Sequence, residues 1–168
     1  MQTAWRPMRA DDLDRVAEIA AIGFPDHFED RDCFANRLAL SPAGCLVLQT
    51  SQGLEGYLVA YPWRMDATPA LNTLIEAIPA DAGVMYLHDL ALTPAVRGQG
   101  WSKPAVRAVV DLARAGRWPT VALVAVNDAA AFWRGHGFEV REAPGMATRL
   151  ASYGPDARYM TRDVAPTV

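Results

Sequence analysis

The chain has few of the residues on which metal-binding and disulfide-stabilised proteins depend. Its 168 residues include only two cysteines and three histidines. The cysteines, Cys33 and Cys45, have neither a CxxC nor a zinc-like spacing, so we expect two buried, reduced thiols in a cytoplasmic protein. No cluster of histidine and cysteine has the spacing of metal ligands, and we therefore expect no metal.

Long apolar runs and a strong excess of one charge are also missing. No run approaches the ~18 apolar residues that a membrane span needs, and the N-terminus lacks the pattern of a secretory signal. The net charge is −3 and no basic stripe is visible, which weighs against nucleic acid as a partner. The length fits one domain, residues 1–168, and 51% apolar residues suffice for its core.

Apolar periodicity and turn residues predict a β-α-α-β-β-β-α-β-α-β-β order. Helices are predicted at 11–24, 30–40, 101–116 and 127–137. Strands are predicted at 3–9, 45–49, 57–61, 84–92, 120–126, 138–142 and 157–164. The less regular stretch 64–83 contains one further short helix, predicted at 71–78. This order predicts a mixed α/β sheet with helices on both faces.

The stretch "VRGQGWSKPA", Val96–Ala105, follows the apolar strand 84–92 and opens a helix. The first amides of a helix have no intrahelical partner, so a glycine-rich loop before them forms an anion site. Gly98 and Gly100 would let the backbone approach a phosphate, and Arg97 and Lys103 add positive charge. The loop matches neither the Walker nor the dinucleotide-binding pattern.

Pro104 restricts how this helix begins. Proline has no N–H, which is harmless only in the first helical turn, and it disfavours helical geometry at the residue before it. Either the helix starts at about Trp101 or later, or its first turn is distorted. The anion site should survive in both cases, because the amides of Gly98 to Lys103 precede the proline. We expect Trp101 to pack on the sheet rather than to cover a ligand.

Two motifs in this context resemble the GNAT family of N-acetyltransferases. "LHDLALTPAVRGQGWS" is similar to the family's coenzyme A motif, Q/R-x-x-G-x-G/A after a strand and a proline turn, with Arg97, Gly100 and Ser102 at the three positions. Ser102 departs from the usual glycine or alanine. "NDAAAFWRGHGF" is similar to the second motif, although Asn127 lies one residue closer to Gly-Phe than usual. The resemblance covers roughly residues 5–164.

The resemblance implies a single-domain GNAT fold, with a mixed, mostly antiparallel central sheet flanked by helices. It also implies acetyl-coenzyme A (acetyl-CoA) as cosubstrate, with its pyrophosphate on the loop amides and its pantetheine arm beside the preceding strand. The central strands should diverge there, and the thioester should lie in the gap. The implied cofactor-binding residues are Leu90, Ala91, Leu92, Arg97, Gly98, Gln99, Gly100, Trp101, Ser102, Lys103, Asn127, Phe132 and Trp133.

Family members transfer the acyl group by direct attack, which requires a base for the amine and a donor for the oxyanion. His88 and Asp89 are the candidate bases. Alternation along a strand places them on opposite faces, so only one should face the gap. We favour Asp89; structural roles, as a helix cap for Asp89 or a core histidine for His88, are the alternatives.

The acid that protonates the departing thiolate is less evident. Trp133 stands where many family members have a tyrosine, and an indole N–H is no proton source near neutral pH. We therefore expect Trp133 to be positional. Tyr153 and Tyr159 are candidate acids, with ordinary packing as the alternative for each. The thiolate can also leave without help.

The resemblance frames the acceptor site by the loop between the first two helices and the loop before the last strand. The first of these, "FPDHFEDRD", carries four acidic residues around His27, which are Asp26, Glu29, Asp30 and Asp32. Such a run is most often a solvated face, but one that faces the cleft would attract a cationic amine.

We therefore expect an acetyl-CoA-dependent N-acetyltransferase that acts on a primary amine of a small molecule or a protein. The alternative is a non-catalytic acyl-CoA-binding module that reports acyl status to a partner. No nucleic acid or membrane is expected as a partner, and a homodimer is left open.

Overall fold

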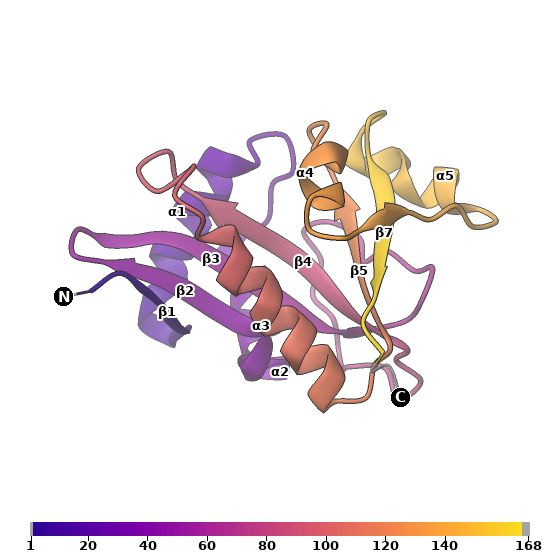
Figure 1. The fold of residues 1–168 in the computed structure, drawn as a ribbon, viewed down its shortest axis with the longest axis horizontal. Helices are drawn as coiled ribbons and strands as arrows, with labels where there is room; N and C mark the ends of the chain where they lie inside the picture. Colours follow the sequence, from indigo (N-terminus) through magenta and orange to yellow (C-terminus); the bar gives the residue numbers. More distant parts are fainter. Residues whose placement is uncertain (1, 166–168) are drawn as a thin grey trace.

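A seven-stranded sheet forms the centre of the computed structural model, which describes residues 2–165 (Figure 1). The strands are β1 (Ala4–Pro7), β2 (Cys45–Thr50), β3 (Gly53–Trp63), β4 (Val84–Leu92), β5 (Thr120–Ala125), β6 (Glu139–Val140) and β7 (Arg158–Asp163). Their order is β1-β2-β3-β4-β5-β7-β6. All neighbouring pairs are antiparallel except β4 and β5, which are parallel. The mixed, mostly antiparallel sheet predicted from the sequence is thus confirmed.

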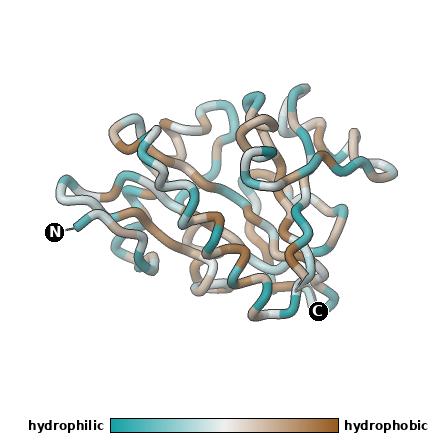
Figure 2. The backbone as a smooth tube through the Cα atoms, in the orientation of Figure 1, coloured by the Kyte–Doolittle hydropathy of each residue, from teal (hydrophilic) through white to brown (hydrophobic). Residues whose placement is uncertain are grey.

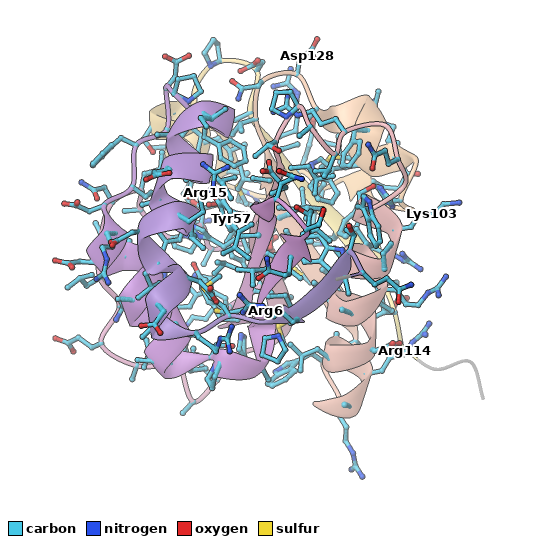
Figure 3. All side chains as sticks on the ribbon, turned by 90° about the vertical axis from the view of Figure 1, so that its left-hand side faces the viewer. Arg6, Arg15, Tyr57, Lys103, Arg114 and Asp128 are labelled. Atoms are coloured by element: carbon cyan, nitrogen blue, oxygen red, sulfur yellow. The ribbon has the colours of Figure 1, made fainter. Side chains whose placement is uncertain are left out.

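Helices cover both faces of this sheet, as predicted (Figure 3). They are α1 (Leu13–Gly23), α2 (Arg31–Leu40), α3 (Ser102–Ala115), α4 (Ala130–Arg134) and α5 (Met146–Leu150). The sequence did not predict α5, which is only five residues long. Among the described residues, no helix is both long enough and apolar enough to cross a membrane.

Two hydrophobic cores form because the strands present apolar side chains to both faces. On one face Val16 and Ile19 of α1 pack with Tyr57 of β3. On the other face Val106 and Val109 of α3 pack with neighbouring strands. Apolar residues are concentrated along the inner strands of the sheet (Figure 2). Full burial of one such side chain stabilises the fold by about 2 kcal/mol.

The two central strands diverge after a short contact. β4 pairs with β5 only at Met85–Val121 and Tyr86–Ala122, whereas β4 stays paired with β3 as far as Leu92. The edge of β4 that faces β5 therefore has no strand partner beyond Tyr86. This is the divergence that the family resemblance implied.

A β-bulge interrupts β4 at the same point. Val59 of β3 lies opposite Asp89, but the next residue, Ala60, lies opposite Leu87, so His88 has no partner on β3. A bulge of this kind inserts one extra residue and breaks the alternation of side chains between the two faces.

The connection between β3 and β4, residues 64–83, contains no helix, and the short helix expected at 71–78 is wrong. Asn72 has a left-handed backbone, with φ of 55°. Side chains of α2 take the backbone groups that a helix would use: Arg37 Nη1 donates to the Thr73 carbonyl at 2.6 Å, and the Ile75 amide donates to Asn36 Oδ1 at 3.0 Å. Tertiary hydrogen bonds thus replace local ones.

Candidate active site

The glycine loop before α3 has the geometry of an anion site. Gly98 and Gly100 have φ of 76° and 86°, the left-handed region that favours glycine. No other atom lies within 4 Å of the position that a Cβ would take at either residue, so the loop is open on that side. α3 begins at Ser102, which places Pro104 third in the helix and inside the first turn. The first of the two predicted alternatives is therefore confirmed.

Polar groups around this loop are held by neighbouring residues. Arg97 Nε donates to the Leu92 carbonyl at 2.8 Å, and Trp5 Nε1 of β1 donates to the Trp101 carbonyl at 3.0 Å. Ser102 Oγ lies 3.3 Å from His136 Nε2. Lys103 is exposed and extends from the start of α3 (Figure 3). The loop thus carries a fixed arginine and a free lysine beside its amides.

A groove of about 240 Å³ leads from the loop along the free edge of β4. Its walls include Leu90, Ala91 and Leu92, together with Arg97 and Ser102. Most of these were predicted as cofactor-binding residues from the sequence. The groove therefore joins the end of β4 to the glycine loop.

A smaller cavity of about 150 Å³ lies further along β4. It shares Phe24, Leu90 and Phe132 with the groove. His88 and Asp89 line it together. The expectation that only one of these two could face the gap is wrong, because the bulge at His88 turns both side chains towards the α1 face.

Hydrogen bonds fix the two side chains. His88 Nε2 lies 2.5 Å from Glu29 Oε1, and His88 Nδ1 lies 2.9 Å from the Tyr61 hydroxyl. The Tyr57 hydroxyl donates to Asp89 Oδ2 at 2.8 Å. The side chains of His88 and Glu29 are only 5% and 4% exposed, so the contact is buried. When the imidazole is protonated it is an ion pair, whose Coulomb attraction must offset a large desolvation cost.

Burial and neighbouring charges shift the pKa values of the three ionisable groups. Burial raises the pKa of Glu29, but the hydrogen bond and charge of His88 outweigh it, and the net shift is downward. Burial lowers the pKa of His88, but Asp89 and Glu29 outweigh it, and the net shift is upward. Burial raises the pKa of Asp89 to about 6. These directions favour the charged forms of both Glu29 and His88. Asp89 is the remaining carboxyl group, and its pKa is the one that burial raises.

Comparison with known proteins agrees with this geometry. A model of the acetyltransferase (GNAT) family matches residues 10–138, which is most of the chain. The protein belongs to the acetyltransferase (GNAT) family. A search of curated proteins found no match.

Solved structures with the GNAT fold superimpose over nearly the whole chain. Ard1 from Thermoplasma volcanium has a TM-score of 0.74 at 16% identity, covering 99% of this chain and 100% of its own. Arabidopsis thaliana Naa50, in complex with the bisubstrate analogue CoA-Ac-MVNAL, has a TM-score of 0.69 at 14% identity, covering 96% of this chain and 97% of its own. The GphF GNAT-like decarboxylase, in complex with isobutyryl-CoA, has a TM-score of 0.72 at 18% identity, covering 96% of this chain and 99% of its own. At these identities the likeness shows the fold alone.

The two tyrosines that were candidate acids of this GNAT protein lie in different places. Tyr153 lines the small cavity, its hydroxyl donates to the Pro69 carbonyl, and burial raises its pKa to about 12. Tyr159 is not among the residues that line the cavity. Its hydroxyl accepts a hydrogen bond from the Asp66 amide at 3.0 Å. Only Tyr153 therefore joins the candidate active site.

Trp133 is 8% exposed and belongs to the core on the α3 face, where it packs edge-on against Phe138 with ring centroids 5.6 Å apart. It also lines the small cavity, as does Phe132. Asn127 is exposed and lines neither the groove nor the cavity. Both cysteines are buried free thiols.

The acidic run between α1 and α2 was predicted to be either a solvated face or a face towards the cleft, and its residues fall into both groups. Glu29 is buried in the ion pair, whereas Asp26, Asp30 and Asp32 are exposed. The sequence analysis missed the partners Tyr57 and Tyr61. Their even spacing along β3 places them on one face, but nothing in the sequence indicated the bulge that brings His88 and Asp89 to that face.

Glu29, His88 and Asp89 also form a group whose potential metal-ligand atoms lie within 4.8 Å of one another. Each side chain is already hydrogen-bonded to protein, and Glu29 shares a proton with the same imidazole nitrogen that a metal would need. The donor set therefore fits a proton better than a cation. That the protein uses no metal stays a prediction.

The hydrogen bond from Tyr57 favours the charged form of Asp89. We predict that Tyr57→Phe raises the pKa of Asp89 above its value of about 6, because the carboxylate then loses a donor. A ¹³C NMR titration of the aspartate side-chain carboxyls measures this. Tyr159→Phe is the control and should leave the Asp89 titration in place. An unchanged or lower pKa in Tyr57→Phe would contradict the assignment.

Proposed function

We propose that the protein is an acetyl-CoA-dependent N-acetyltransferase, a single domain that transfers acetyl directly to a primary amine. One observation carries this proposal. A groove runs from the glycine loop along the unpaired edge of β4 to a cavity lined by a carboxyl group whose pKa is about 6. We also expect the protein to lie in the cytoplasm, where buried free thiols stay reduced.

The groove and loop fit acetyl-CoA. The amides of Gly98 to Lys103, at the start of α3, would hold the pyrophosphate, with Lys103 and Arg97 beside it. The free edge of β4 from Leu90 to Leu92 would pair with the pantetheine arm, which is a chain of amides. The Leu92 carbonyl already accepts from Arg97, so this arginine would mark the end of the paired stretch.

Starting from an ammonium, the chemistry removes two protons from the nitrogen and returns one to the sulfur, so that one proton is released. Asp89 takes a proton from the bound ammonium, and the neutral amine attacks the thioester carbon. Backbone amides on the unpaired edge of β4 donate to the oxyanion. The C–N bond forms, the nitrogen of the tetrahedral adduct loses its second proton to water, the C–S bond breaks, and the sulfur takes a proton from Tyr153 or from water. Glu29 occupies His88 Nε2 and the Tyr61 hydroxyl occupies Nδ1, so neither ring nitrogen is free to take this proton and we assign the base to Asp89.

The glycine loop provides a direct test of acetyl-CoA binding. We predict that Gly100→Asp weakens acetyl-CoA binding at least tenfold, because a carboxylate would lie beside the pyrophosphate. Gly100→Asn is the matched control: asparagine has the same shape and tolerates a left-handed backbone, but it is uncharged. Calorimetry with acetyl-CoA measures both variants. Equal affinity in the two would remove the loop from the site.

Asp89 provides the test of catalysis. We predict that Asp89→Asn lowers kcat/KM by on the order of 100-fold, with unchanged acetyl-CoA affinity. In the wild-type protein kcat/KM should fall below a pH of about 6, where Asp89 becomes protonated, and the variant should lack this limb. Asp26→Asn, an exposed aspartate in the acidic run between α1 and α2, is the control. Binding of acetyl-CoA without release of CoA to any amine would favour the alternative, a non-catalytic acyl-CoA-binding module.

Tyr153 and Trp133 can be separated by single substitutions. We predict that Tyr153→Phe lowers kcat with little change in acetyl-CoA affinity, because it removes the proton donor that lines the cavity. Trp133→Phe should leave turnover within a few-fold and cost mainly packing, because an indole N–H does not protonate a thiolate. Steady-state kinetics with calorimetry measures both effects. A wild-type rate in Tyr153→Phe would show that the thiolate leaves unassisted or through water.

A further inference from the structure

A strap, residues Asp66–Thr73 of the connection between β3 and β4, joins the two segments that frame the acceptor side. Towards α2, the Asn72 amide donates to Glu29 Oε2 at 3.2 Å, and Asn72 Oδ1 accepts from the Asp30 amide at 2.9 Å. Arg37 Nη1 donates a hydrogen bond to the Thr73 carbonyl at 2.6 Å. The strap is therefore tied to the segment between α1 and α2.

The other end of the strap is tied to the segment before β7. Arg141 donates hydrogen bonds to both carboxylate oxygens of Asp66, at 2.7 and 2.9 Å. Arg149 Nη1 donates to the Asp66 carbonyl at 2.8 Å. The Tyr153 hydroxyl donates to the Pro69 carbonyl. A two-bond arginine–carboxylate contact also fixes orientation.

The two framing segments also touch directly. His27 Nε2 lies 2.7 Å from the Tyr153 carbonyl, so this nitrogen carries a proton and donates. His27, Tyr153 and Leu71 of the strap all line the cavity, so this contact bridges the two framing segments beside it. A peptide with an extended chain advances about 3.3–3.6 Å per residue and needs an open groove between the segments. The bridge occupies part of the space that such a groove would need.

The walls of the cavity are mostly apolar. Phe24, Leu71, Tyr86, Val124 and Tyr153 line it. Its volume is about 150 Å³, and an apolar cavity of about this size holds a molecule such as benzene. The space therefore suits a small acceptor with an apolar body.

The charges in the cavity suit a single ammonium. Glu29 is paired with His88, which leaves Asp89 as the carboxyl group in the cavity with no basic side chain hydrogen-bonded to it. His27 Nδ1 is buried and has no hydrogen-bond partner, so it is an acceptor that an N–H donor would satisfy. Within the described part of the chain, no arginine or lysine lines this cavity. A carboxylate on the acceptor would have no partner, and a second ammonium would meet an apolar wall.

Resting on the proposed function, we propose that the acceptor is a small primary monoamine with an uncharged, apolar body. The bridge between the framing segments disfavours peptide N-termini. The lack of a basic side chain in the cavity disfavours amino acids, and the apolar walls disfavour polyamines.

A panel of four acceptors tests this proposal by CoA release. We expect benzylamine to have a kcat/KM at least 100-fold above those of phenylalanine, spermidine and a pentapeptide with a free N-terminus. Preferred turnover of any of the other three would overturn the inference and leave the proposed function standing. Acetyl-CoA binding without turnover of benzylamine would also overturn the inference. Failure to bind acetyl-CoA would overturn the proposed function, and the inference with it.

Leu71 provides a second, structural test. Leu71→Trp should fill the cavity and raise the KM for benzylamine more than tenfold, with acetyl-CoA affinity unchanged. The matched control is Leu74→Trp on the same connection, where the side chain is 62% exposed. Leu71→Ala should enlarge the cavity and shift the preference from benzylamine towards 4-phenylbutylamine. An unchanged order of amines in Leu71→Ala would show that the acceptor does not contact this wall.

Discussion

The bulge at His88 is the constraint on which the candidate active site depends. A regular strand would send His88 and Asp89 to opposite faces, and one of them would enter the core on the α3 face. With one extra residue in β4, both side chains meet the tyrosines of β3 and Glu29. The bulge lies where β4 separates from β5, so the same short stretch supplies both the ionisable groups and the unpaired backbone beside them.

Charge balance then decides which group can accept a proton. An isolated imidazolium or carboxylate in this cavity would be costly, but Glu29 and His88 share that cost as a pair. The pair also occupies His88 Nε2, while the Tyr61 hydroxyl occupies Nδ1, so neither ring nitrogen is free to act as a base. Asp89 is buried without a cation of its own, so its pKa rises to about 6. A carboxyl group with this pKa is ionised at neutral pH and yet more basic than an exposed aspartate.

The sequence predicted most of the sheet because its strands are long, apolar and bounded by turn residues. The glycine loop was equally readable, since Gly98 and Gly100 are positions that need a left-handed backbone. The bulge could not be predicted from the sequence, because it depends on the register between β3 and β4. The pairing of Glu29 with His88 joins residues 59 positions apart. Local sequence patterns do not predict contacts between residues so far apart in the chain. The irregular connection 64–83 was misread for the same reason: its backbone is satisfied by α2 rather than by itself.

The GNAT fold by itself leaves the acceptor undetermined. The strap joins the proposed acceptor side to the candidate catalytic groups, because Asn72 contacts Glu29 through one carboxylate oxygen while His88 contacts the other. Moving the strap would therefore remove a donor from Glu29 and disturb its contact with His88. The proposed determinants of acceptor choice thus lie in one connection, which contacts Arg37 of α2 at one end and Arg141 after β6 at the other.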